Sequence, residues 1–396
     1  MIYILGINGF IARNFYLELK KQKRDITCLS HDDLYILPKI SNDDIVINFC
    51  GANRGNLIDD YYKVNYKFVK KIIKNFKRNG TEPYFVHISS LMVNGFLNKT
   101  TKDLSEHQQN FINSKLKGEK YLVENYPNSK LCIIRPSNIY GYDCEPYYNN
   151  ILVTLINEKI KKNHKINKIN KNCIRNFLSI DGLCYEMQKL IDDKLYGIFN
   201  IVSNNSINLD LLVNLIYDNQ IPNEISIDNG EETISNIDSD IPVVLIVHNE
   251  NLSDMIKLIE TKMEIYINLC QKVEIKILNR LSQPRGDMVE ITDLNSNRLY
   301  MITLNDHSTR GNHYHYQQIE HFYQYEGKVI FLLADKEYPD IIFFKIINKN
   351  SLVTVNPLII HTVVNDFINN KCELIVSSTQ AFIANKIPDT EYTTII

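Results

Sequence analysis

The sequence has little of what would direct a chain to nucleic acid or to a membrane. Its formal net charge is only −2, so it carries no basic footprint for nucleic acid or anionic lipid. Its apolar runs have the length of strands, and none could span a bilayer. The opening stretch MIYILGINGF lacks the basic segment and the cleavage site of a signal peptide. We therefore expect neither a nucleic-acid partner nor a membrane partner.

Two further absences concern residue types. The chain has no Trp and is rich in Asn, Ile, Lys and Tyr, a bias that suggests an AT-rich genome such as that of a large DNA virus. Its eight Cys include no CxxC pair, and most of them lie in apolar stretches. Scattered thiols of this kind indicate buried, reduced Cys, because disulfides are rare in the cytosol. The pattern favours a cytoplasmic location, in the host cell if the source is viral.

The length of the chain and its patterning predict two domains. A chain of 396 residues is too long for one ordinary core. Residues 1–224 combine buried apolar runs with helical patterns, which predicts an α/β domain with a Rossmann-type doubly wound parallel sheet. Residues 278–396 show short alternating strands separated by turns, which indicates an all-β barrel or jelly roll. Residues 225–277 fit neither pattern, and we interpret them as a connector with a possible small βα unit.

A dinucleotide site is predicted at the N-terminus of the first domain. An apolar strand at residues 1–5 runs through Gly6 and Gly9 into a helical pattern. Gly6 would permit a tight turn, and Gly9 would let backbone N–H groups approach a pyrophosphate at the start of the helix. The second strand ends at Ser30 and His31, where an acidic residue would select NAD. NADP is therefore favoured over NAD.

Later motifs in this domain resemble those of the extended short-chain dehydrogenase/reductases. The turn CGANR at 50–54 and the stretch SSLMVNG at 89–95 each follow an apolar strand, and FINSK at 111–115 lies in a helical pattern. In that family a Ser orients the substrate oxygen, a Tyr transfers the proton, and a Lys lowers the Tyr pKa. Ser90 and Lys115 match the Ser and the Lys, but Phe111 stands at the Tyr position. A phenyl ring has no exchangeable proton, so either reduction is poor or water or another side chain supplies the proton.

The same resemblance implies the binding residues of the first domain. The candidates for cofactor binding are Gly6, Asn8, Gly9, Phe10, Ile11, Ser30, His31, Cys50, Gly51, Ala52, Asn65, Lys115 and Pro136. The candidates for substrate binding are Asn53, Arg54, Ser90, Asn138 and Arg175. Arg175 lies in a segment, RNFLSID, like the one whose Arg grips a sugar-nucleotide diphosphate. The alternative for Arg175 is a surface salt bridge.

A metal site is predicted in the second domain, within RGNHYHYQQIEHFYQYEG at 310–327. His313 and His315 are two residues apart on a strand and so point the same way, and Glu320 follows a short turn. A later strand adds His361. Imidazoles with a carboxylate suit Zn²⁺ or another divalent first-row metal. The alternative is a pair of surface His on a hairpin, but the combined spacing resembles a cupin metal site, with Leu358 where cupins usually have Gly.

The two domains together resemble one narrow family, the bifunctional capsule and O-antigen enzymes of the CapF or WbjC type. The resemblance rests on RGNHxHxxxxE and on a terminal PDTxY at 388–392, behind a reductase-like domain. In that family the cupin epimerises C3 of a UDP-2-acetamido-2,6-dideoxy-4-hexulose, and the N-terminal domain reduces C4 with NADPH. The resemblance implies a UDP-sugar substrate, NADPH, a metal such as Zn²⁺ and a homodimer.

The resemblance also assigns roles within the cupin. It implies His315, Glu320 and His361 as metal ligands, with His313 as a fourth. The metal would either polarise the ketone oxygen or hold the shape of the barrel. The acid/base stays open, with Tyr316, His321 and Tyr323 as nearby candidates.

Other functions stay open at this point. The chain could be a sugar-nucleotide binding module with a degenerate reductase domain, or an epimerase whose first domain serves dimerisation or cofactor-dependent folding. It could also be a non-catalytic cupin with a structural metal. Phe111 favours these alternatives. Complete decay of the first domain is opposed by the presence of Gly6, Gly9, Ser90, Lys115 and Arg175.

Overall fold

The structure is a computed structural model. It describes residues 1–29, 40–55, 57–93, 105–148, 150–162, 168–170, 173–219, 226–228, 243–283, 286–289, 291, 296–380 and 389–396. The chain forms two compact units, residues 1–19 with 29–261 and residues 20–28 with 262–396. Within the described ranges, no helix is both long and apolar enough to cross a membrane.

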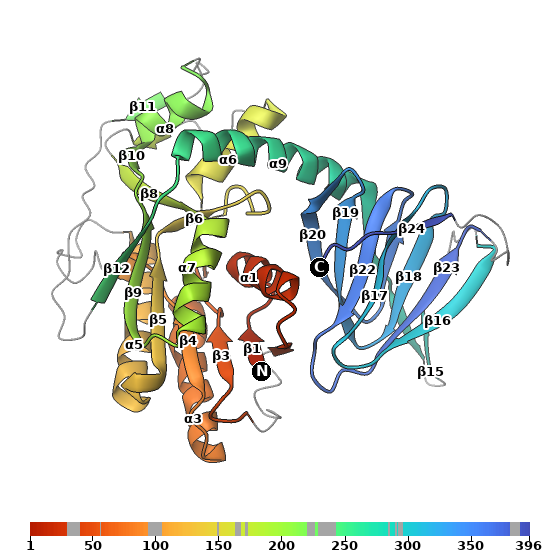
Figure 1. The fold of residues 1–396 in the computed structure, drawn as a ribbon, viewed down its shortest axis with the longest axis horizontal. Coiled ribbons are helices and arrows are strands. Elements are labelled where there is room, and N and C mark those ends of the chain that lie inside the picture. The colour runs from red at the N-terminus through yellow and green to blue at the C-terminus, as the bar shows by residue number, and fades with distance from the viewer. Residues whose placement is uncertain are drawn as a thin grey trace. The chain divides into compact units, whose positions relative to one another are not determined.

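A seven-stranded sheet with the order β12-β9-β5-β4-β3-β1-β2 forms the centre of the first fold. Its strands are β1 (Ile2–Leu5), β2 (Ile26–Leu29), β3 (Ile45–Asn48), β4 (Tyr84–Ile88), β5 (Leu131–Pro136), β9 (Gly197–Ser203) and β12 (Val243–His248). Neighbouring strands are parallel along the series β1, β3, β4, β5, β9 and β12. Strands β1 to β5 are buried along their whole length, as expected for a parallel sheet with helices on both faces (Figure 1).

Helices connect these strands. They are α1 (Phe10–Lys21), α2 (Ile58–Tyr62), the π-helix η2 (Lys63–Phe68), α3 (Val69–Asn79), α5 (Glu106–Asn125), α6 (Ile151–Lys161), α7 (Ile180–Asp192) and α8 (Leu209–Ile216). The helix α5 begins with a capping box, in which the Ser105 hydroxyl accepts the Gln108 N–H and the Gln108 side chain accepts the Ser105 N–H. This cap fixes the start of the helix that carries Phe111 and Lys115.

Short strands and one turn of 3₁₀-helix complete the first fold. A three-stranded sheet joins β10 (Ser206–Asn208), β8 (Ile174–Ser179) and β6 (Asn138–Tyr140). A two-stranded sheet joins β7 (Lys168–Asn170) and β11 (Ser226–Asp228), and η4 (Asn128–Lys130) precedes β5.

The second fold consists of two five-stranded antiparallel sheets, β13-β21-β18-β23-β16 and β20-β19-β22-β17-β24, with a hairpin β14-β15 (Figure 1). The first sheet contains β13 (Val273–Ile277), β21 (Ser351–Val355), β18 (Glu320–Glu326), β23 (Cys372–Ser378) and β16 (Arg298–Leu304). The second contains β20 (Tyr338–Asn348), β19 (Lys328–Asp335), β22 (Ile359–Asn365), β17 (Ser308–His315) and β24 (Thr390–Tyr392), and the hairpin contains β14 (Arg280–Gln283) and β15 (Gly286–Val289). Inward side chains such as Phe322, Phe331, Val363 and Val376 form one core between the sheets.

The predicted fold classes are confirmed, with a Rossmann-like parallel sheet followed by a cupin-like pair of antiparallel sheets. The described part of the predicted connector, 225–277, is divided between them. Its strand β12 extends the parallel sheet beside β9, whereas β13 pairs with β21. The long helix α9 (Leu252–Lys272) lies between these two strands in the chain.

Candidate active sites

The turn between β1 and α1 has the shape that a dinucleotide site needs. Gly6 has φ +86°, and a Cβ there would lie 2.9 Å from the Cys50 backbone nitrogen, so only Gly fits. The Gly9 N–H donates to the Gly6 carbonyl at 2.9 Å, which closes the turn. Asn8 and Gly9 are exposed, and Phe10 and Ile11 begin the helix. The exposed turn at the positive end of the α1 dipole can receive an anionic group.

The turn after β3 lies against the turn between β1 and α1. The Asn65 amide clamps Ala52, accepting its N–H at 2.9 Å and donating to its carbonyl at 3.0 Å. The same amide donates to the Ser114 hydroxyl at 2.9 Å, which links η2 to α5. A Cβ at Gly51 would lie 2.9 Å from Lys115 Nζ. The structure therefore brings the predicted cofactor residues of this turn together with Lys115.

Lys115 is a buried cation. It is 3% exposed, and its Nζ donates to the Ile88 carbonyl at 3.1 Å. Burial lowers the Lys115 pKa from 10.5 to about 8, although Glu119 and Cys50 act in the opposite direction. Ser90, two residues beyond Ile88, is half-buried, and its hydroxyl accepts the Met92 N–H at 3.3 Å.

Phe111 is buried one turn before Lys115 on α5. Its ring is 8% exposed and packs in a cluster with Tyr61, Ile112 and Ala52. The Phe111 side chain is therefore packed in an apolar cluster, and it offers no hydroxyl group near Lys115. Ser30 and His31, on which the preference for NADP depends, lie outside the described residues.

The predicted substrate residues of the first unit are found in two places. Arg54 and Asn53 are exposed in the turn after β3, and the Arg54 guanidinium lies 5.0 Å from the Tyr148 ring centroid. Asn138 and Arg175 lie on the neighbouring strands β6 and β8. The Asn138 amide donates to the Asn176 carbonyl at 2.9 Å, so it holds the two strands together. Pro136 ends β5, just before Asn138.

In the second unit, a β-bulge places His313 opposite His361. Gly311 pairs with Thr362 and His313 pairs with His361, so Asn312 is an extra residue on β17. Gly311 has φ +102°, and a Cβ there would lie 2.4 Å from the His361 carbonyl oxygen. Residues directly opposite each other share one face of a sheet, so both imidazoles point into the same space. Their ring centroids are 4.4 Å apart.

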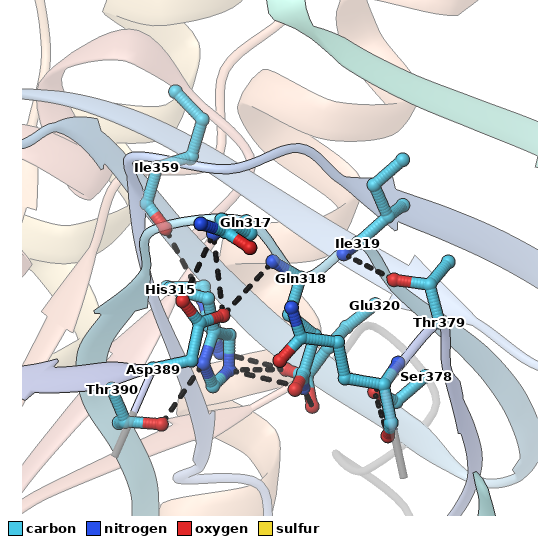
Figure 2. A network of polar contacts seen from close by, with 12 residues as sticks. His315, Gln317, Gln318, Ile319, Glu320, Ile359, Ser378, Thr379, Asp389 and Thr390 are labelled. Atoms are coloured by element: carbon cyan, nitrogen blue, oxygen red, sulfur yellow. Dashed lines mark hydrogen bonds and ion pairs between the residues drawn. The ribbon is translucent and has the colours of Figure 1, made fainter. Parts of the chain in front are cut away.

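Four side chains meet between the two sheets. His313, His315 and His361 come from one sheet and Glu320 from the other, and their candidate ligand atoms all lie within 4.8 Å of one another. Glu320 Oε2 is 3.3 Å from His315 Nε2 and 3.1 Å from His361 Nε2. Figure 2 shows the side chains of His315 and Glu320 turned toward each other. We refer to these four residues as the His₃Glu cluster.

Burial and charge shape the titration of this cluster. Burial alone would raise the Glu320 pKa, but hydrogen bonds and charge from His315 and His361 outweigh it and lower the pKa well below its usual range. Burial, assisted by His361, lowers the His313 pKa from 6.5 to about 4. The carboxylate is therefore ionised and the His313 imidazole neutral at neutral pH, which are the forms that bind metal.

A second layer of residues orients the cluster. The Tyr300 hydroxyl donates to Glu320 Oε1 at 3.0 Å, and the Gln318 amide donates to the same oxygen at 2.9 Å. His315 Nδ1 is 3.0 Å from the Thr390 hydroxyl (Figure 2). Such contacts fix ring and carboxylate orientation in metal sites. Thr390 belongs to the PDTxY motif, whereas no sequence motif pointed to Tyr300, because it reaches the cluster through strand pairing over a long separation.

The cluster fits a divalent metal. Three imidazoles and one carboxylate are a donor set that Zn²⁺ and related metals accept. His313 Nδ1 is buried and has no hydrogen-bond partner among the described residues, whereas His361 Nε2 has Glu320 Oε2 at 3.1 Å. A buried nitrogen atom without a partner is costly unless another group satisfies it.

The three sequence candidates for acid/base catalysis lie apart from the cluster. Side chains alternate faces along a strand, so His321 points away from the face of Glu320 on β18, and Tyr316, just after the end of β17, is exposed. The Tyr316 hydroxyl donates to Glu391 Oε2, and His321 Nδ1 is 3.0 Å from the Thr354 hydroxyl. The Tyr323 hydroxyl donates to Asn350 at 3.2 Å. The structure therefore does not bring these three residues to the His₃Glu cluster.

Comparison with known families decides the identity of the first unit. A family model described as the NAD dependent epimerase/dehydratase family matches residues 2–201, just over half of the chain. The chain belongs to this family. A second model, the polysaccharide biosynthesis C-terminal domain, matches residues 282–391. The prediction of a reductase-type domain followed by a cupin-type domain is thereby confirmed. No curated protein matches the chain.

Several solved structures are similar to this chain at low sequence identity. CapF, a capsular polysaccharide assembling protein from Staphylococcus aureus, is 19% identical over 99% of each chain, with a TM-score of 0.45. MoeE5 in complex with UDP-glucose and NAD is 14% identical over 66% of this chain and 97% of its own, with a TM-score of 0.51. A UDP-glucose 4-epimerase from Thermotoga maritima, solved with UDP-glucose, is 12% identical over the same shares, with a TM-score of 0.51. The last two likenesses show the fold alone, over about two thirds of the chain.

Proposed function

We propose that the protein modifies a nucleotide sugar in two steps. The cupin-like unit exchanges the C3 proton of a UDP-2-acetamido-2,6-dideoxy-4-hexulose and so epimerises C3. The first unit then reduces the C4 ketone with NADPH. The observation that carries this proposal is the His₃Glu cluster, a buried metal-type site on the same chain as a dinucleotide-binding fold.

The first step needs a proton removed beside a ketone and a place for the negative charge that develops on the ketone oxygen. A divalent metal, probed first as Zn²⁺, would be held by His313, His315, Glu320 and His361 and would supply Lewis-acid polarisation of that oxygen. Tyr300 and Gln318 hold the Glu320 carboxylate in position for this role. The outward positions of Tyr316 and His321 disfavour them as the group that takes the C3 proton.

The second step needs a bound cofactor and a proton donor. The turn at Gly6 and Gly9 and the buried Lys115 support cofactor binding. A substrate role for Arg54 and Arg175 stays part of the proposal. The buried Phe111 ring favours one alternative, in which the protein is an epimerase only and the first unit binds cofactor and sugar nucleotide without reducing it.

Product analysis tests the first step. Metal-replete protein is incubated with the 4-keto sugar nucleotide in D₂O without NADPH, and the product is analysed by mass spectrometry. We expect one deuterium to enter at C3, and we expect Glu320→Gln to abolish its incorporation. Absence of deuterium with the unmodified protein would sink the epimerase proposal.

The second step is tested by adding NADPH. Oxidation of NADPH with the keto sugar is expected to be slow and to rise in Phe111→Tyr, because a phenol at this position adds a general acid where the family pattern has one. A general acid typically contributes about 10²–10⁴-fold. An unchanged rate in Phe111→Tyr would show that the proton comes wholly from another group. No oxidation in either protein would favour the epimerase-only alternative.

A further inference from the structure

A tyrosine that the family pattern does not use packs against the Phe111 ring. Tyr61, on α2, is 2% exposed and shares the buried cluster of Phe111, Ile112 and Ala52. Ala52 follows Gly51, the residue whose Cβ would lie 2.9 Å from Lys115 Nζ. Tyr61 therefore shares a buried cluster with the neighbour of Gly51, and it carries the hydroxyl that Phe111 lacks.

The Tyr61 hydroxyl is bonded to a titratable side chain. It accepts the Gly55 N–H at 2.9 Å and shares a hydrogen bond with His107 Nδ1. His107 is exposed in the first turn of α5, and it lies four residues before Phe111, so both side chains lie along one face of the helix. A buried phenol joined to an exposed imidazole forms a path by which protons can move between the protein interior and water.

We propose that Tyr61, assisted by His107, donates the proton that Phe111 cannot donate. This inference rests on the reductase half of the proposed function. The carbonyl carbon of the keto sugar gains a hydride from the reduced nicotinamide, which becomes oxidised. The carbonyl oxygen gains the proton that leaves the Tyr61 hydroxyl. The Tyr61 phenolate then takes a proton from His107, and His107 regains one from water.

The first arm of the test measures NADPH oxidation with the keto sugar. Tyr61→Phe is expected to lower kcat by about 10²-fold or more. Tyr62→Phe, which removes a hydroxyl from the next residue of the same helix, is the matched control and is expected to keep kcat. The double variant Tyr61→Phe with Phe111→Tyr is expected to be as active as Phe111→Tyr alone, because the phenol at position 111, one turn before Lys115, then donates the proton. If the role of Tyr61 were purely structural, its loss would lower the rate of the Phe111→Tyr protein as well.

The second arm does not depend on turnover. NADPH affinity, followed by its fluorescence on binding, is expected to be the same in Tyr61→Phe and the unmodified protein. The ¹⁵N resonances of the His107 ring are expected to shift in Tyr61→Phe and to stay in place in Tyr62→Phe. These readouts establish that the substitution removed a hydrogen bond to His107 and left the cofactor site intact.

The outcomes separate this inference from the proposed function. If the unmodified protein oxidises no NADPH with the keto sugar, the reductase proposal fails and this inference fails with it. If the unmodified protein is active and Tyr61→Phe is equally active, the inference alone is wrong. If Tyr61→Phe lowers the rate by the same factor in the Phe111→Tyr protein as in the unmodified protein, the loss is structural and the inference is again overturned.

Discussion

At the scale of single residues, the first unit buries several charged side chains, and the position of Lys115 among them is typical of function rather than stability. Lys115 is almost fully enclosed, and burial lowers its pKa from 10.5 to about 8. A Lys whose pKa is lower in the folded chain than in the unfolded chain destabilises the fold. This cost is fully present at a pH below both pKa values and falls as the pH rises between them. Folding therefore gains stability as the pH rises from about 8 to 10.5.

Replacing Lys115 by Met should reveal this cost. Met has a similar length and no charge, so Lys115→Met should be more stable than the unmodified protein at pH 7.5. At pH 10 the difference in the free energy of unfolding between the two proteins should be smaller by on the order of 3 kcal/mol, because the unmodified protein no longer buries a charge there. Urea unfolding followed by the helical circular dichroism signal measures it. The exposed Lys120→Met is the control, and an equal pH dependence in both variants would contradict the prediction.

A second residue-scale prediction concerns Tyr300, whose hydroxyl donates to Glu320 Oε1 at 3.0 Å. Loss of such an orienting contact typically costs about 10–100-fold in metal affinity. Tyr300→Phe should therefore bind Zn²⁺ more weakly by this factor, measured by competition with a chromophoric chelator. Tyr325→Phe, on an exposed ring of β18, should bind Zn²⁺ as the unmodified protein does. Unchanged affinity in Tyr300→Phe would mean that Gln318 alone orients the carboxylate.

At the scale of elements, the sequence predicted well those features that repeat locally. Buried apolar runs predicted the parallel strands, and the spacing of His313 and His315 predicted side chains on one face. Features that depend on pairing between distant segments could not be predicted in this way. Examples are the bulge at Asn312 and the addition of β12 to the parallel sheet. Both depend on which residues of two distant strands pair, and the residue pattern of one segment does not specify its partner.

Leu358 shows how a departure from a sequence pattern is accommodated by the backbone. It stands where the cupin pattern usually has Gly, and it adopts φ +66°, the left-handed conformation that Gly adopts without strain. Its N–H donates to the His315 carbonyl at 2.8 Å, and its carbonyl accepts the Lys336 N–H at 3.1 Å. These two bonds hold the turn before β22 in the strained conformation, so the path of the chain toward His361 is retained.

A pair of substitutions measures that strain. Leu358→Gly and Leu358→Ala both remove the side chain, but only Ala keeps the Cβ that disfavours positive φ. Leu358→Gly should therefore be more stable than Leu358→Ala by about 1 kcal/mol. Lys345, exposed on β20, is the control site, because there the Gly variant should be the less stable of the two. Equal stability of the Leu358 pair in thermal unfolding would show that the turn relaxes when the side chain is removed.

At the scale of the whole molecule, the two units should respond differently to metal. The described ligand candidates of the His₃Glu cluster all belong to the second unit, and they join its two sheets. A ligand that binds only the folded state stabilises it by about 2.7 kcal/mol at a free concentration of 100 times its Kd. Metal should therefore raise the unfolding temperature of the second unit and leave that of the first unchanged.

Calorimetry with and without Zn²⁺, and after treatment with a chelator, tests this expectation. One of two transitions should move to higher temperature with Zn²⁺ and return with chelator. Glu320→Gln should abolish the shift, because it removes the charge that faces His315 and His361. His321→Gln, one residue along β18 and on the opposite face, should keep the shift. If both transitions move together, or if Glu320→Gln responds as fully as His321→Gln, the metal does not bind at the His₃Glu cluster.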